Sequence, residues 1–270
     1  MNKLNRILGV AVLGLSLVSC STPLTILHVN DTHSHLEPAR DAFCHNQGGV
    51  IERAMIVDEV RAKKGADNVL LLHAGDFNQG TSYYTKFEGE LEVQVVNAMG
   101  YDCITLGNHE FDNGLQHLAG RLAKIECPVV CANLKLEGTP LEGIVKPYTI
   151  VEKAGKKIGI IGLIPNNIRT VISASVAEGI VQYNSVEVVN KYATQLKEQD
   201  GCDLVILLSH LGLGSDKYIC RSIKDVDIIV GGHSHDFIKK PIYRRDYTGH
   251  KVCIVTDGCW GLEVGELIVR

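Results

Sequence analysis

Five apolar, strand-like runs in this chain each end in residues that can bind a metal ion or a phosphate group. In chain order, the residues that follow these runs are Asp31 and His33, Gly75 and Asp76, Gly107 to Glu110, His210, and Gly232 to His235. An α/β sheet builds a site in this way, because its parallel strands release their last side chains at one edge. A single aspartate after a strand is uninformative. Five such endings that offer imidazoles, carboxylates and an amide predict a metal centre.

The candidate ligands of this centre are Asp31, His33, Asp76, Asn108, His210, His233 and His235. Asp31 and His33 are two residues apart, as are His233 and His235, so each pair lies on one side of an extended segment. Asp76 has two carboxylate oxygens and can bridge two cations, which is the arrangement that two-metal hydrolysis needs. Mixed nitrogen and oxygen donors in this number predict two divalent ions, and the choice among Mn, Zn, Mg, Fe and Ca stays open.

Charge balance favours a phosphate ester as the substrate of such a centre. Two divalent ions bring four positive charges, while Asp31, Asp76 and a bridging hydroxide supply three negative ones, so about one positive charge remains. This charge attracts an anionic phosphoryl group, and the metal-bridging hydroxide would attack its phosphorus in line.

The segment after the third strand-like run contains a second candidate device. Asp112 follows His109 by three residues, a spacing that lets a carboxylate hydrogen-bond an imidazole and raise its basicity. His109 would then be a cationic general acid for the leaving oxygen, with Asp112 as its partner. The alternative is that His109 is one more metal ligand.

The amino terminus has the features of an export signal. Lys3 and Arg6 precede a short apolar run over residues 7–18, and residues 17–20 resemble a bacterial lipoprotein cleavage box that ends in Cys20. The run is shorter than the roughly 20 residues that a membrane-spanning helix needs. Acyl chains on Cys20 would hold the protein on the outer face of a bacterial membrane, in the periplasm or at the cell surface. An uncleaved anchor is the alternative.

Charge and cysteine content restrict the class of protein further. The formal net charge of −4 falls to −6 when the two cations Lys3 and Arg6 leave with the signal. A mildly acidic chain argues against a broad face for nucleic-acid polymers, because such faces cluster Lys and Arg. Most cysteines lie in or beside apolar runs, so we expect buried thiols. A disulfide between Cys127 and Cys131, or between Cys253 and Cys259, is the alternative.

The elements that must position these residues alternate along the mature chain. Apolar periodicity predicts helices over 49–64, 91–99, 115–125 and 185–199, a short helix after 215, and strands over 69–72, 103–106, 204–208 and 227–230. Runs over 148–152 and 156–163 predict a hairpin. Short runs over 241–243, 252–256 and 264–269 have no helix between them. This mixture predicts mixed sheets in one α/β domain.

The five motif blocks together resemble the signature of the calcineurin-like metallophosphoesterases. Residues 30–35 (AsnAspThrHisSerHis) and 107–112 (GlyAsnHisGluPheAsp) look like the 5′-nucleotidase branch of that family. The resemblance covers essentially the whole mature chain. It implies a four-layer α/β/β/α sandwich with two mixed β-sheets, in which residues 1–19 are a signal peptide and residues 20–270 the catalytic domain.

The resemblance also implies how the ligands divide. One metal would be held by Asp31, His33, Asp76 and His235, and the other by Asp76, Asn108, His210 and His233. His109 and Asp112 would be the catalytic pair. In some nucleotidases a glutamine stands at the position of His235.

Nucleotidases of this branch normally continue into a second domain, which supplies an aromatic pair for the base and arginines for the phosphate. This chain ends at Arg270, so the resemblance assigns none of its residues to base recognition. We expect either a separate substrate-binding protein or a substrate that is smaller or held differently.

The resulting hypothesis is an exported, lipid-anchored two-metal phosphoesterase of 5′-nucleotidase type, acting on nucleoside monophosphates or related phosphate esters. One alternative is a phosphodiesterase or pyrophosphatase that acts on cyclic nucleotides or nucleotide sugars. Another is the catalytic half of a two-chain nucleotidase that is inactive without its partner. A plain metal-binding lipoprotein is disfavoured, since metal capture has no use for His109 and Asp112.

Overall fold

The computed structural model describes residues 23–40 and 46–270. The predicted signal peptide, residues 1–19, and the predicted lipidation site Cys20 lie outside the described residues. No helix in the described part of the chain is both long enough and apolar enough to cross a membrane. The cysteines within that part are free thiols, and all of them except Cys127 are buried, as expected from the sequence.

Two six-stranded sheets form the centre of the molecule. The first sheet has the spatial order β12 (Gly265–Val269), β1 (Leu24–Val29), β2 (Val69–His73), β3 (Cys103–Thr105), β4 (Val129–Val130) and β5 (Val145–Lys146). The second has the order β10 (Ile242–Arg245), β11 (Lys251–Val255), β9 (Ile228–Gly231), β8 (Leu204–Ser209), β7 (Lys156–Leu163) and β6 (Tyr148–Lys153).

Both sheets are mixed, as the sequence predicts. Strands β1 to β5 are parallel, and β12 pairs with β1 in the antiparallel sense. Strands β7, β8, β9 and β11 are likewise parallel, with antiparallel β6 and β10 at the edges. The predicted hairpin is the β6–β7 pair. The helix-free run near the carboxyl terminus supplies the antiparallel pair β10–β11 in the second sheet and then β12, which pairs with β1 in the first sheet.

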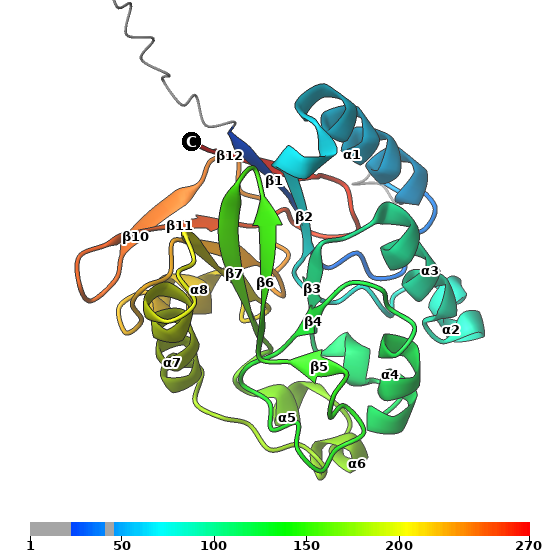
Figure 1. Ribbon diagram of the computed structural model, residues 1–270. Helices are drawn as coiled ribbons and strands as arrows, with labels where there is room; N and C mark the ends of the chain where they lie inside the picture. Colours follow the sequence, from blue (N-terminus) through cyan, green and yellow to red (C-terminus); the bar gives the residue numbers. More distant parts are fainter. Residues whose placement is uncertain (1–22, 41–45) are drawn as a thin grey trace, which may run out of the picture.

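Helices cover the outer face of each sheet (Figure 1). The first sheet packs against α1 (Val50–Lys64), α3 (Glu90–Met99) and α4 (Leu115–Leu122), and the second against α7 (Ser185–Glu198) and α8 (Leu213–Ile219). A third apolar cluster lies between the two sheets. The four-layer α/β/β/α sandwich that the family resemblance implies is therefore confirmed.

The side chains of β1 and β2 show why the strands hold this central position. Leu27 and Leu71 pack toward the helices, whereas Ile26 and Leu70 pack between the sheets. Side chains alternate across a strand, so a strand that is buried on both faces must be apolar at nearly every position. Every residue of β1 and β2 is buried, which fixes the strand ends firmly.

Several short elements have no predicted counterpart. They are β5, α2 (Ser82–Phe87), α5 (Ile168–Val171), α6 (Ala174–Ala177) and two 3-10 turns at Ala66–Asn68 and His109–Phe111. Each is too short to show an apolar period. Helix α2 begins instead with a local signal, because the Thr81 side chain accepts a hydrogen bond from the backbone N–H of Tyr83.

The sheet arrangement brings the carboxyl ends of five parallel strands to one edge. Asp31 and His33 follow β1, Asp76 follows β2, and Asn108 follows β3 in the first sheet. In the second sheet, His210 follows β8, and the segment 232–235 follows β9. Because the sheets face each other, the two sets of strand ends meet at this edge.

Candidate metal centre

The seven predicted ligands lie together at this edge, and six of them form two groups. Asp31, His33 and His235 form one group, and Asp76, His210 and His233 form the other. Within each group, the ligand-type atoms all lie within 4.8 Å of one another. These two groups agree with the two ligand sets that the family resemblance implies. The seventh residue, Asn108, offers an amide oxygen instead of a carboxylate or an imidazole and belongs to neither group.

Two carboxylates, Asp76 and Asp31, connect the two groups. The Oδ2 atom of Asp76 lies 3.0 Å from Nε2 of His210 in its own group and 3.9 Å from Nε2 of His33 in the other. The Oδ1 atom of Asp31 lies 3.4 Å from Nε2 of His235 and 3.7 Å from Nε2 of His210. Four ligands at about 2.1 Å from a zinc-like ion in a tetrahedron would be about 3.4 Å apart, so these spacings fit metal ligands.

Buried polar atoms without partners point to the same conclusion. Asp31 Oδ1 and Asn108 Oδ1 are buried and make no hydrogen bond within the described residues. A buried polar atom normally has a partner, because leaving it unpaired is unfavourable. Both oxygens carry lone pairs, and a cation would satisfy them together. The donor set therefore fits divalent ions.

The imidazole rings are oriented by main-chain carbonyl groups. His210 Nδ1 lies 2.6 Å from the Ala74 oxygen, and His33 Nδ1 lies 3.3 Å from the Asn78 oxygen. A carbonyl oxygen can only accept, so Nδ1 carries the hydrogen in both rings. Nε2 is thereby left to face the centre, as in metal sites whose ligands are held by outer hydrogen bonds.

The charges of the centre are strongly coupled. Burial disfavours the charged form of His210, but the carboxylates of Asp76 and Asp31 outweigh it and raise the pKa of His210 to about 10. Burial likewise opposes ionisation of Asp31 and Asp76, yet the facing His210 keeps the pKa of each carboxyl below its usual range. A cation that binds here must therefore displace a proton, and its affinity will rise with pH.

Five of the candidate ligands have a left-handed backbone. The φ angles are 50° at Asp31, 45° at His33, 55° at Asp76, 77° at His233 and 54° at His235. Residues other than glycine rarely adopt this region, and such strain concentrates at functional sites. The sharp turns direct side chains from strands of two different sheets toward the same point.

His109 and Asp112 form the pair that their spacing predicts. His109 Nδ1 lies 2.9 Å from Asp112 Oδ2, and this hydrogen bond raises the pKa of His109. The backbone N–H of His109 donates to Asp76 Oδ1 at 2.9 Å, and its ring stands edge-on to that of His33. Neither ligand group found in the described part of the chain includes His109. This geometry disfavours the alternative that His109 is a further ligand.

Glu110 is a central residue that sequence reasoning did not single out. It is buried, and its two oxygens accept the backbone N–H groups of Asp76, Phe77, Asn78 and Gly107 at 2.9, 3.0, 3.1 and 2.6 Å. Burial, followed by the charge of Asp76, raises the pKa of Glu110 to about 7. One carboxylate thus holds the two loops that carry Asp76 and Asn108.

Gly107 makes the close approach of these loops possible. A Cβ atom at this position would lie 2.6 Å from Nε2 of His210 and would meet Asp76 Oδ1 at still closer range. Real Cβ contacts are essentially never this short, so any side chain at residue 107 would displace candidate ligands.

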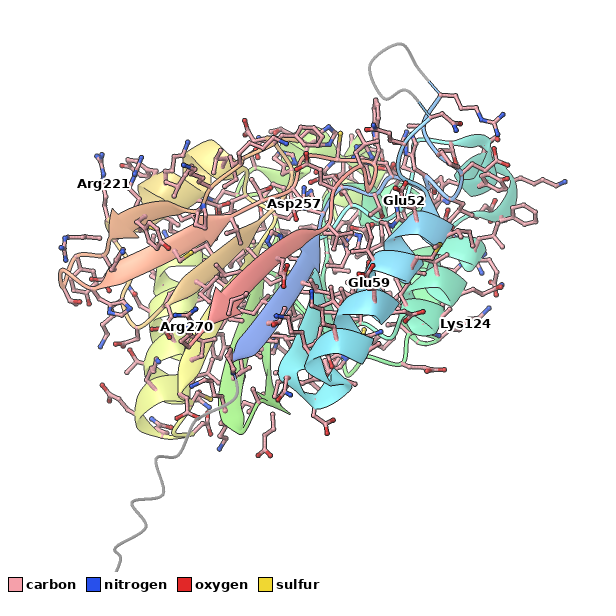
Figure 2. The ribbon with its side chains drawn as sticks, turned by 90° about the horizontal axis from the view of Figure 1, so that it is seen from above. Glu52, Glu59, Lys124, Arg221, Asp257 and Arg270 are labelled. Carbon is pink, nitrogen blue, oxygen red and sulfur yellow. The ribbon has the colours of Figure 1, made fainter. Side chains whose placement is uncertain are left out.

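The carboxyl-terminal loop fastens Asp31. Asn30 donates to Asp31 Oδ2 at 2.7 Å and accepts the backbone N–H of Asp257 at 2.9 Å. The backbone N–H of Trp260 donates to the main-chain oxygen of Asp31 at 2.7 Å. Oδ2 of Asp257 also lies 2.9 Å from Nδ1 of His28. Figure 2 shows Asp257 between helix α1 on one flank and Arg221, just after α8, on the other. No sequence pattern predicts contacts across more than 200 residues.

The match to known proteins follows this geometry. The family model described as calcineurin-like phosphoesterase matches residues 24–237, which include all seven candidate ligands and the His109–Asp112 pair. The chain belongs to the calcineurin-like phosphoesterase family. Its two mixed sheets and flanking helices are those of solved 5′-nucleotidase structures.

Relatives within the family share the fold closely. A snake venom 5′-nucleotidase from Gloydius brevicauda is 38% identical over 233 residues, 83% of this chain and 39% of the relative. The crystal structure of a 5′-nucleotidase precursor from Thermus thermophilus has a TM-score of 0.83 and 33% identity, covering 92% of this chain and 51% of that one. The NAD nucleotidase of Haemophilus influenzae has a TM-score of 0.81 and 32% identity, covering 91% and 47%. The chain spans about half the length of these proteins, or less.

Proposed function

We propose that the chain is a two-metal phosphoesterase of 5′-nucleotidase type that hydrolyses nucleoside monophosphates or related phosphate esters. The observation that carries the proposal is the arrangement around Asp76. Two groups of ligand-type side chains face each other across this carboxylate, and the His109–Asp112 pair lies beside them. Relatives named 5′-nucleotidase support the choice of substrate class.

In this proposal Asp31, His33, Asp76 and His235 would hold the first ion, and Asp76, Asn108, His210 and His233 would hold the second. Two divalent ions, when bound, would neutralise charge on the phosphoryl group and lower the pKa of the water molecule that attacks phosphorus. The near-complete burial of Asp31, Asp76 and His210 strengthens these electrostatic effects, because little water screens them.

His109 supplies the proton to the leaving oxygen. Asp112 occupies Nδ1 of the ring, so Nε2 is the nitrogen that faces a substrate. The hydrogen bond to Asp112 raises the pKa of His109 and so favours the protonated ring that a general acid requires. The backbone hydrogen bond from His109 to Asp76 fixes the distance between this acid and the bridging carboxylate. His109 is therefore positioned against the same phosphoryl group that the ions would bind.

A substrate panel with matched variants tests the proposal. The purified chain is assayed with Mn²⁺ against AMP, an aryl phosphate and NAD, and bound metal is measured in the same samples. We expect AMP turnover by the wild type, and a loss of at least about 100-fold in His109→Ala with the metal content unchanged. His117→Ala is the control, since His117 pairs with Glu88 at 3.7 Å and belongs to neither ligand group. No turnover of any ester with metal bound would contradict the proposal.

Hydrolysis of a phosphodiester or pyrophosphate bond, in cyclic nucleotides or nucleotide sugars, is a second candidate function. The similarity to the NAD nucleotidase of Haemophilus influenzae favours it, because NAD contains a pyrophosphate. The same metal centre serves both reactions. NAD turnover in the panel at a rate above that of AMP would establish this second function.

Export, the lipid anchor on Cys20 and a separate substrate-binding protein stay predictions from the sequence. Labelling of the full chain with radioactive palmitate tests the anchor. The wild type should incorporate the label, and Cys20→Ala should not. Restoration of AMP turnover by an added protein, when the chain alone is inactive, would show that it is the catalytic half of a two-chain nucleotidase.

A further inference from the structure

A groove without an assigned role lies at the same sheet edge as the metal centre. Its volume is about 570 Å³, within the range of small-molecule sites. Asn166 follows strand β7, and Leu211 directly follows the candidate ligand His210, so both lie at the carboxyl ends of parallel strands. The groove is closed on one side by the segment before α7 and on the other by α8.

The α8 side of the groove is connected to the metal centre. A Cβ atom added to Gly212 would lie 3.6 Å from the His233 ring, so this segment passes directly over a candidate ligand. The backbone N–H of Leu213 donates to Ser234 Oγ at 3.0 Å. Gly214, the next residue, already lines the groove. The groove therefore begins two residues after Gly212, at the sheet edge that carries the metal centre.

The lining of the groove carries no charged side chain. None of the residues that line it is Asp, Glu, Lys, Arg or His, although Asp, Glu, Lys and Arg alone make up 21% of the chain. A phosphate, a cation or an acidic peptide would find no counter-charge there. The groove thus suits a neutral ligand.

Two tyrosines stand on opposite sides of the groove. Tyr218, on α8, is 71% exposed, and Tyr183, before α7, is 43% exposed. Neither hydroxyl group has a hydrogen-bond partner in the described part of the chain. Exposed aromatic faces bind planar rings, and stacking of a base on such a ring is favourable for any base.

Polar groups of the groove are held in place and still have bonding capacity. Asn166 accepts a hydrogen bond from the buried Ser185 hydroxyl through Oδ1, which leaves its NH₂ group as a donor. Gln182 donates to the Pro165 oxygen at 2.8 Å, which leaves its carbonyl as an acceptor. A fixed donor and a fixed acceptor match the hydroxyl groups of a sugar and the edge of a base.

We propose that this groove binds an uncharged nucleoside, as the leaving part of a nucleotide substrate and as the free product. The proposal deepens the proposed function and rests on it for the link to turnover. It gives the chain a base-binding surface of its own, which the sequence resemblance does not assign.

Adenosine binding tests the inference without any turnover. Calorimetry on the full chain with Mn²⁺ should show adenosine binding that Tyr218→Ala weakens about tenfold, the effect of removing one stacking face. Tyr183→Ala should weaken it as well. Tyr247→Ala is the matched control, because Tyr247 is 57% exposed and lies outside the groove. Unchanged affinity in both groove variants, no adenosine binding by the wild type, or equal affinity for ribose alone would overturn the inference.

Kinetics separate this inference from the proposed function. Tyr218→Ala should raise the KM for AMP about tenfold with little change in kcat, and should leave methyl phosphate hydrolysis unchanged. If AMP is hydrolysed and its KM does not respond to Tyr218→Ala, the groove inference fails and the proposed function stands. If no ester is hydrolysed but adenosine binds through Tyr218, the proposed function fails and the groove inference stands.

Discussion

Replacement of Glu110 by glutamine removes the acceptor that joins the two ligand loops. The Oε2 atom of Glu110 accepts the N–H groups of Asp76 and Gly107, and Oε1 accepts those of Phe77 and Asn78. In Glu110→Gln one oxygen becomes an NH₂ group, which can only donate. Two buried N–H groups therefore lose their acceptor whichever way the amide is turned.

The size of the effect follows from these two lost hydrogen bonds. A buried donor without an acceptor costs about 1–3 kcal/mol, so two cost roughly 2–6 kcal/mol. The neutral side chain avoids the burial of a charge, which offsets part of this loss. We expect the free energy of unfolding to fall by about 3 kcal/mol and Mn²⁺ affinity to fall by about 10- to 100-fold, the range seen when groups that orient metal ligands are removed.

Urea denaturation in the presence of a chelator measures the first quantity, and calorimetric Mn²⁺ titration the second. Glu142→Gln is the matched control. The exposed Glu142 accepts a single backbone N–H, from Gly138 at 2.8 Å, which glutamine can retain. A Glu110→Gln protein within about 0.5 kcal/mol of the wild type, with unchanged Mn²⁺ affinity, would refute the role given to this carboxylate.

The centre and its surroundings lead to three further predictions. Gly107→Ala should lower Mn²⁺ affinity at least tenfold, because the added Cβ atom would meet Asp76 and His210. Gly120→Ala is the control and should bind Mn²⁺ normally, because no atom lies near the added Cβ. Equal Mn²⁺ affinities of the two variants would contradict this prediction. Burial raises the pKa of Asp216 to about 7, so the folded state holds a proton that the unfolded state releases. The free energy of unfolding, measured by denaturation, should therefore fall as pH rises from about 4 to 7. An equal fall in Asp216→Asn, which lacks the titrating group, would count against this role of Asp216. Chelation should lower the thermal midpoint of the wild type but not that of Asp76→Asn, as read by calorimetry.

The strand-end ligands could be found from sequence because two local signals coincide there. An apolar run marks each buried strand, and a metal-binding side chain directly after it marks the sheet edge. Asp31 after β1 and Asp76 after β2 are examples. The mixed sheets and the long helices follow from the same apolar periodicity. The structure brings these side chains together, while their roles as ligands stay a proposal until metal is measured.

The remaining features depend on contacts that no local pattern encodes. Glu110 lies three residues from Gly107 in the chain, but its bonds to Asp76, Phe77 and Asn78 require β2 and β3 to be neighbours. The link from Asn30 to Asp257 spans 227 residues. Helix α2 has only six residues, fewer than two turns, so its apolar pattern is indistinguishable from that of a loop.

The central claim is that Asp76 bridges two metal ions, and metal stoichiometry tests it most directly. The full chain, dialysed after loading with Mn²⁺, is analysed by inductively coupled plasma mass spectrometry beside Asp76→Asn and Asn108→Ala. We predict two ions per chain in the wild type, a loss of both in Asp76→Asn and a loss of one in Asn108→Ala. One ion per chain in the wild type, or two retained in Asp76→Asn, would contradict the account.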